Sequence, residues 1–172
     1  EYRLDAEAIS AALLHDIAED TRISLEQISD EFGPEVARLV DGVTKLKEVT
    51  SGVAEADRAL TAEEVQQATL RKLLQAMTTD VRVVIIKLFD RLHNMRTIRG
   101  MAPHRQRAKA EETLSVYAPL AYRLGMWNVK SELENRSLEV LQPHVYESIR
   151  AELERQVRAQ APLFEVAREQ II

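Results

Sequence analysis

Signals that begin and end helices recur along the 172-residue chain, and they constrain the fold more than any other feature. Ser24 with Gln27 and Thr61 with Glu64 each form a capping box, in which the two side chains satisfy free amide groups at a helix start. Proline in a first helical turn and glycine just after a helix end are further boundary signals. The sequence therefore predicts a succession of helices, with such punctuation at Gly33, Pro34, Gly100, Pro103 and Pro143.

The expected helices follow from these signals and from apolar residues spaced three and four positions apart. The first helix is expected to be capped near Asp5. We expect a mobile loop over 50–59, a break near Tyr117 caused by Pro119, and a kink or stop at Pro162. The predicted helices cover 1–20, 24–33, 34–47, 61–79, 81–100, 103–117, 127–141 and 143 onward.

Composition favours an all-α fold. Aromatic residues make up only 5% of the chain and glycine and proline are few, whereas aliphatic and charged helix formers abound. This length suits one domain with an extension, and we expect a domain over 1–142 and a helical C-terminal extension over 143–172. The chain begins at Glu1 without a methionine, which we interpret as the start of a fragment.

Charge and cysteine content exclude several classes of function. A net charge of −5 argues against a general nucleic-acid-binding surface. The absence of cysteine excludes disulfides and thiolate-ligated metals, and it fits a reducing, cytoplasmic location. No apolar run approaches the length of a membrane span, and no signal peptide is visible.

A cluster of polar residues, His15-Asp16 followed by Glu19-Asp20, comes directly after an apolar run. On a helix, His15 would lie beside Glu19 and Asp16 beside Asp20, because residues four apart share a face. Imidazole and carboxylate groups are good ligands for Mn²⁺, Fe²⁺ or Zn²⁺. The alternative is a solvated acidic helix end, but acidic residues there oppose the helix dipole. We therefore favour a metal site.

A second constellation follows the apolar stretch 81–86. On a helix, Asp90, Asn94 and Thr97 fall on one face, with His93 at its edge. Taken alone, Asp90 with the adjacent Arg91 is more often a surface ion pair. Together with the first cluster, Asp90 is a candidate third ligand from a second buried helix.

The combined motifs resemble the hydrolase domain of the RelA/SpoT (Rel) family, a branch of the HD phosphohydrolase superfamily. The resemblance covers about 4–146, far more than a bare His-Asp pair. It implies an all-α, HD-domain helical bundle that hydrolyses the 3′-pyrophosphate of guanosine (p)ppGpp with Mn²⁺, giving GDP or GTP and pyrophosphate. The matching segments are His15-Asp16, Glu19-Asp20-Thr21, Asp41-Gly42-Val43-Thr44-Lys45-Leu46, Asp90-Arg91-Leu92-His93-Asn94-Met95-Arg96-Thr97, Tyr117-Ala118-Pro119-Leu120-Ala121 and Arg123-Leu124-Gly125-Met126.

The resemblance also assigns roles to individual residues. It implies that His15, Asp16 and Asp90 bind the metal and that Glu19 and Asp20 are the catalytic pair. The family's remaining metal-ligand His lies N-terminal to this helix, so we expect Mn²⁺ to bind weakly to the chain as given. Packing, or support of a neighbouring metal ligand, is the better interpretation of His93. The candidate substrate-binding residues are Asn94, Thr97, Lys45 and Arg91.

Several alternatives stay open. Lys45 and Lys47 mark either a solvated helix end or a phosphate contact, and the same holds for the basic face of Arg105, Arg107 and Lys109. The domain could also be another HD-type nucleotide phosphohydrolase, or a non-catalytic regulatory HD domain of a (p)ppGpp synthetase. We expect (p)ppGpp as the small-molecule partner, with no nucleic acid or membrane bound by this domain. A parent protein with synthetase and regulatory domains is compatible with the resemblance.

Overall fold

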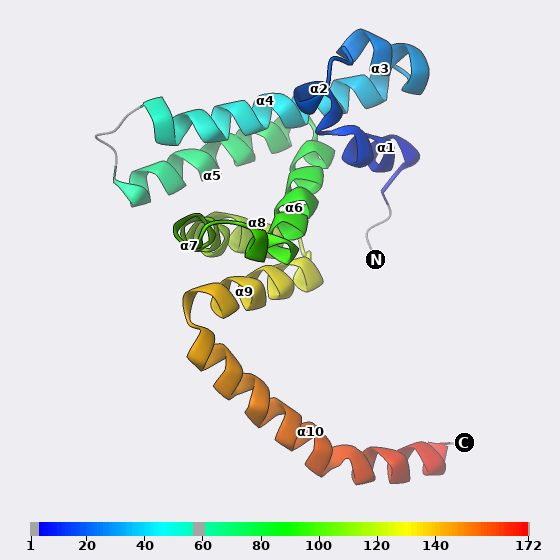
Figure 1. The fold of residues 1–172 in the computed structure, drawn as a ribbon. Coiled ribbons are helices and arrows are strands. Elements are labelled where there is room, and N and C mark those ends of the chain that lie inside the picture. The colour runs from blue at the N-terminus through cyan, green and yellow to red at the C-terminus, as the bar shows by residue number, and fades with distance from the viewer. Residues whose placement is uncertain (1–3, 57–60, 172) are drawn as a thin grey trace.

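The computed structural model describes residues 4–56 and 61–171, and the side chains at 19, 48–56, 62 and 161–171 lie outside what it describes. Within those ranges every regular element is a helix, which confirms the predicted all-α fold (Figure 1). The elements are α1 (Ala6–Leu14), α2 (Ile17–Asp20), α3 (Leu25–Phe32), α4 (Pro34–Ala56), α5 (Ala62–Thr79), α6 (Val81–Arg96), the 3₁₀ turn η1 (Ile98–Gly100), α7 (Pro103–Glu112), the π-helical segment η2 (Thr113–Tyr117), α8 (Ala118–Arg123), α9 (Trp127–Leu141) and α10 (Pro143–Ile171).

Local capping chemistry sets several of these boundaries. Both predicted capping boxes form, at Ser24 for α3 and at Thr61 for α5. Asp80 caps α6 through its side chain, which accepts from the backbone amide of Arg82. Gly33 adopts a φ of 91° between α3 and α4, a conformation that a residue with a Cβ rarely takes. The chain therefore turns where the sequence signals predicted.

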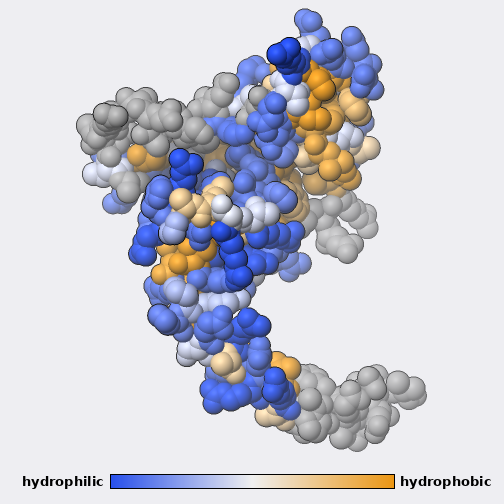
Figure 2. Space-filling model, viewed as in Figure 1, coloured by the Kyte–Doolittle hydropathy of each residue, from blue (hydrophilic) through white to orange (hydrophobic). Residues whose placement is uncertain are grey.

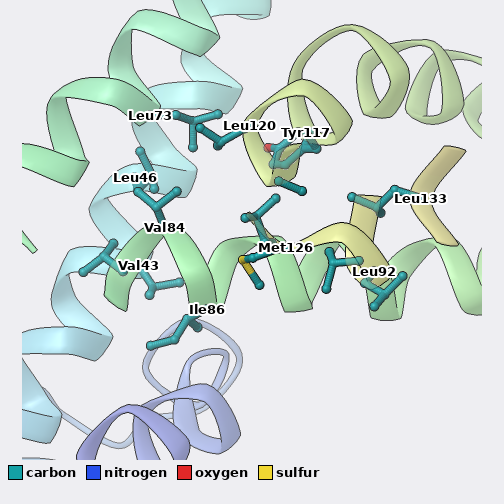
Figure 3. Close-up of a cluster of buried hydrophobic side chains, with 14 of the residues drawn as sticks. Val43, Leu46, Leu73, Val84, Ile86, Leu92, Tyr117, Leu120, Met126 and Leu133 are labelled. Carbon is teal, nitrogen blue, oxygen red and sulfur yellow. The ribbon is translucent and has the colours of Figure 1, made fainter. Parts of the chain in front are cut away.

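Helix α6 is the centre of the fold. It contacts α1, α4 and α5 toward one end and α9 and η2 toward the other, so it joins the two halves seen in Figure 1. Eight of its sixteen residues are buried. Figure 3 shows its apolar side chains meeting those of neighbouring helices, and the labelled members of this core are Val43, Leu46, Leu73, Val84, Ile86, Leu92, Tyr117, Leu120, Met126 and Leu133. Any side chain on the polar face of α6 is thereby held on a rigid support.

Helices α4 and α6 approach each other closely at Gly42. A Cβ added there would lie 2.9 Å from Cγ2 of Val83, which is buried and branched next to the backbone. Glycine is unfavourable inside a helix, yet this position has no room for alanine. The glycine thus allows α4 to pack against the helix that carries Asp90.

The structure corrects the expectation of one helix over 1–20. The chain leaves the helix after Leu14 and starts again at Ile17. Nδ1 of His15 lies 2.8 Å from the carbonyl oxygen of Ala12, so the side chain takes a carbonyl that the helix would otherwise use. His15 and Asp16 consequently sit in a turn, and their predicted pairing with residues four positions later does not follow from helix geometry.

Two other boundaries also differ from the prediction. Helix α4 continues to Ala56, so most of the predicted 50–59 loop is helical, and 57–60 lies outside the described residues. Pro119 does not end its helix, because it occupies the first turn of α8, where no amide donor is needed, after the widened turn η2. Of the two outcomes expected at Pro162, a kink or a stop, the structure excludes the stop, because α10 runs on to Ile171; this helix bends and projects from the rest of the molecule (Figure 1).

The surface carries apolar side chains at both ends of the molecule. Figure 2 shows them gathered over the α1–α3 end, where Ile9, Leu13 and Phe32 are exposed. On α10 an exposed apolar stripe repeats every four residues from Val145 to Val157. None of the helices in the described ranges has a long enough apolar stretch to cross a membrane.

Candidate metal site

Three predicted metal ligands meet where α1 ends beside α6. Nε2 of His15 lies 3.1 Å from Oδ2 of Asp16 and 3.8 Å from Oδ1 of Asp90. His15 and Asp16 come from the turn between α1 and α2, whereas Asp90 comes from the middle of α6. The predicted contact between these distant segments is therefore confirmed, although their role as ligands stays a prediction.

The two ring nitrogens of His15 have different surroundings. Because a carbonyl oxygen can only accept, Nδ1 donates its proton to Ala12. Nε2 is buried and has no hydrogen-bond partner among the described residues, although two carboxylates face it. The Asp90 carboxylate raises the pKa of His15, against burial, which lowers it. Nε2 therefore faces carboxylates that favour either a proton or a cation between them.

Asp90 is held by neighbours on its own helix. The Lys87 ammonium donates to its Oδ2 at 2.6 Å, and the Asn94 amide donates to its Oδ1 at 2.6 Å. Burial by itself would raise the pKa of Asp90, but His15 and Lys87 outweigh that effect and hold the pKa well below its usual range. Asp90 is thus an oriented, ionised carboxylate in a largely buried position.

The remaining polar residues of the first cluster lie closer to solvent. Nζ of Lys47, from α4, lies 3.4 Å from Oδ1 of Asp16. The side chain of Asp20 is exposed, and that of Glu19 lies outside the described residues. The structure brings Asp16 to His15 and leaves Asp20 at the rim of the site.

The predicted substrate-binding residues are more scattered. Asn94 contacts Asp90. The exposed Thr97, at the end of α6, instead donates a hydrogen bond from its hydroxyl group to the carbonyl oxygen of His93. Lys45 is exposed and pairs with Asp41 on its own helix at 2.6 Å. His93 is exposed, so of the two roles expected for it, packing is wrong, and support of a metal ligand stays a prediction.

Arg91 points away from solvent into a second polar cluster. Only 8% of Arg91 is exposed; its guanidinium lies 4.0 Å from the ring centre of Tyr117, and its Nη2 donates to Glu112 at 2.8 Å. Its Nη1 is buried and has no hydrogen-bond partner among the described residues. Burial lowers the pKa of Lys109, and the charge of Arg91 lowers it further. This cluster joins α6 to α7 and η2 beside Asp90.

Comparison with known sequences identifies the fold family. The sequence profile of the HD domain matches residues 1–127. The chain belongs to the HD domain family. A guanosine-3′,5′-bis(diphosphate) 3′-pyrophosphohydrolase of Haemophilus influenzae is 47% identical over 150 residues, which cover 87% of this chain and 21% of that protein.

Other relatives of this HD domain carry two kinds of name. A probable GTP pyrophosphokinase of Mycobacterium leprae is 50% identical over 87% of this chain and 18% of that protein. The bifunctional (p)ppGpp synthase/hydrolase SpoT of Escherichia coli is 43% identical over 87% of this chain and 20% of that protein. The chain spans about a fifth of the length of these relatives. They place this HD domain in the RelA/SpoT group.

HD domains are metal-dependent hydrolases, so the donors present must be tested against a cation. In the part of the chain that the structure describes, no three His, Cys, Asp or Glu side chains already form a closed set around one ion. The donors nevertheless fit a divalent cation, because one imidazole nitrogen without a partner faces two carboxylates. Asp16 and Asp90 would have to loosen their contacts with Lys47 and Lys87.

Sequence reasoning missed three lysines around the HD-domain site. Lys87 was not singled out, although its position three residues before Asp90 on a helix could have indicated the contact. Lys47 was expected at a solvated helix end or at a phosphate, yet it reaches Asp16 across helices. Lys109 was grouped with its exposed neighbours, because only the packing of α7 against the neighbouring helices separates it from them.

Proposed function

We propose that this HD domain hydrolyses the 3′-pyrophosphate of guanosine (p)ppGpp and releases GDP or GTP with pyrophosphate. The observation that carries the proposal is the approach of His15 to both Asp16 and Asp90 at a buried imidazole nitrogen that has no hydrogen-bond partner among the residues described. The names of hydrolase relatives at 43–47% identity support this choice of substrate.

The candidate ligands are His15, Asp16 and Asp90, with Mn²⁺ as the proposed ion. When bound, such an ion offsets the charge of a pyrophosphate ester and lowers the pKa of a coordinated water. Lys87 and Asn94 keep the carboxylate of Asp90 directed, and the hydrogen bond from Nδ1 of His15 to Ala12 makes Nε2 the acceptor nitrogen of the neutral ring.

Glu19 and Asp20 are the proposed catalytic pair. The exposed position of Asp20 on the short helix α2 suits a group that takes a proton from the attacking water and passes it to solvent. Asn94, Thr97 and Lys45 remain proposed substrate contacts near the surface. Arg91 is mostly buried, so we assign it to the inner side of the substrate site.

A non-catalytic regulatory role is the second candidate. It is favoured by the Mycobacterium leprae relative, which is named as a probable GTP pyrophosphokinase. This chain keeps His15, Asp16, Glu19, Asp20 and Asp90, which a purely regulatory domain would not need. We therefore rank hydrolysis first. Another HD-type nucleotide phosphohydrolase is less favoured, because the names of the similar proteins point to guanosine (p)ppGpp.

We also propose how this domain sits in a larger protein. Residues 1–142 would form the hydrolase domain, and 143–172, which contain α10, would lead toward a synthetase domain. The length of the relatives supports further domains in the parent protein. We propose a cytoplasmic location, which fits the absence of cysteine.

The test follows pyrophosphate release from ppGpp, together with Mn²⁺ titration, for each variant. Glu19→Gln or Asp20→Asn should slow release by about 10²–10⁴-fold, since an amide cannot accept the proton, while Mn²⁺ binding is kept. Asp90→Asn should lose Mn²⁺ binding and activity together. Unchanged hydrolysis in both the Glu19 and the Asp20 variants would remove this pair from the mechanism and favour a broader phosphohydrolase.

A further inference from the structure

Lys109 differs from the other basic residues of α7. Arg105 and Arg107 are exposed, and Arg107 pairs with Glu111 at 3.1 Å. Lys109 is partly buried, and its Nζ makes no hydrogen bond or ion pair with a described residue. Its ammonium group thus lacks an anionic partner although it is partly removed from water, an arrangement that is unfavourable for a charged group.

The cations nearest to Lys109 are already paired with carboxylates. Lys109 lies one helical turn before Glu112 on α7, and Glu112 accepts a hydrogen bond from Arg91 at 2.8 Å. The charges of Arg91, Lys87, Asp90 and Glu112 all act on its ammonium group. Lys87 is paired with Asp90 and Arg91 with Glu112, which leaves the charge of Lys109 unmatched. Arg91 is more than nine-tenths buried, and its Nη1 also has no hydrogen-bond partner within the described ranges. Two cationic side chains therefore have unused donors close to one predicted metal ligand.

We propose that Lys109, together with Arg91, forms an anion subsite beside Asp90 that holds the pyrophosphoryl group. The assignment to this part of the substrate rests on the proposed function, in which the scissile bond lies at Asp90. Phosphate oxygens form strong charge-assisted hydrogen bonds with ammonium and guanidinium groups, so a pyrophosphate satisfies the donors that the protein leaves unpaired. The 5′-phosphates of the nucleotide would lie farther from Asp90.

The test measures binding rather than catalysis. Inorganic pyrophosphate is titrated by calorimetry into the purified, metal-free protein at low ionic strength, where charge interactions are least screened. Lys109→Met should weaken pyrophosphate binding by roughly 10- to 100-fold, the effect of losing one hydrogen bond to a charged group. Lys109→Arg should restore most of the affinity.

The matched control removes a lysine charge elsewhere. Lys130 on α9 pairs with Glu134 and lies outside this cluster, so Lys130→Met should leave pyrophosphate binding unchanged. Thermal unfolding of each variant confirms that the fold is kept. GDP binding, measured in the same way, should not change in Lys109→Met.

The outcomes separate this subsite from the proposed function. The subsite is overturned if the unaltered protein binds no pyrophosphate, if Lys109→Met binds it normally, or if Lys130→Met weakens binding equally. A Lys109→Met protein that loses GDP binding but retains pyrophosphate binding would also overturn it. Failure of the protein to hydrolyse ppGpp, with Lys109-dependent pyrophosphate binding intact, would refute the proposed function and leave the subsite standing.

Discussion

Lys87→Met should destabilise the protein, because it leaves the carboxylate of Asp90 largely buried without its ammonium partner. The side chains are 8% and 14% exposed, and Nζ lies 2.6 Å from Oδ2. Breaking a buried ion pair from one side costs about 3–5 kcal/mol. Asn94 still donates to Asp90, and His15 still faces it, so we expect Lys87→Met to lower the free energy of unfolding by about 2–4 kcal/mol.

A second lysine provides the comparison. Lys130 pairs with Glu134 at 2.7 Å, nearly the same distance, but these side chains are 24% and 42% exposed. Exposed pairs contribute only about 0–1 kcal/mol, so Lys130→Met should have a small effect. Urea unfolding of both variants gives the two free energies of unfolding directly.

A double-mutant cycle isolates the interaction itself. In Asp90→Asn the carboxylate charge is already absent. Adding Lys87→Met to this variant should therefore lower the free energy of unfolding much less than it does in the unaltered protein. Two results would refute the reasoning that burial makes this pair important. One is an equal loss of unfolding free energy from Lys87→Met with and without Asp90→Asn, and the other is an equal loss from Lys87→Met and Lys130→Met.

Two further predictions concern the support of the site. Gly42→Ala should lower the urea midpoint despite its better helix propensity, because the added methyl group meets Val83 at 2.9 Å; a midpoint that rises would show that the helices adjust freely. The ion pairs of Glu35 with Arg38 and Arg82 lower its pKa to about 2, so it contributes stability above its ordinary pKa and loses it as pH falls from about 4.5 to 2. Melting temperatures should therefore fall less across that range in Glu35→Gln than in the unaltered protein, and an identical fall would exclude this contribution.

The fold was predictable where its determinants are local. The capping boxes at Ser24 and Thr61 involve residues three apart in sequence, so their chemistry can be inferred without knowing the packing. Proline at the start of α7 and α10 acts through its own backbone. These signals placed most helix starts correctly.

Boundaries that depend on a specific interaction were missed. The break after Leu14 accompanies the hydrogen bond between the His15 ring and Ala12, and periodicity cannot reveal such a competition. Pro119 was expected to break a helix, but the π-helical turn before it lets the chain continue. Both the helix break after Leu14 and the π-helical turn before Pro119 depend on the conformation of the neighbouring backbone.

The site was predicted only in part, for a similar reason. The resemblance grouped His15 and Asp16 with Asp90, and the structure places Nε2 of His15 within 4 Å of a carboxylate oxygen of each aspartate. It gave no information on Lys109, whose neighbour Arg91 lies on a different helix. Charge balance inside a cluster depends on which helices pack together, and a motif does not contain that information.

Product analysis is the most direct test of the central claim, that this site cleaves the 3′-pyrophosphate. The protein is incubated with ppGpp and Mn²⁺, and the products are separated and identified by phosphorus NMR. We predict GDP and inorganic pyrophosphate in equal amounts, with neither formed by Asp90→Asn. Release of orthophosphate instead of pyrophosphate, or undiminished cleavage by Asp90→Asn, would contradict the account.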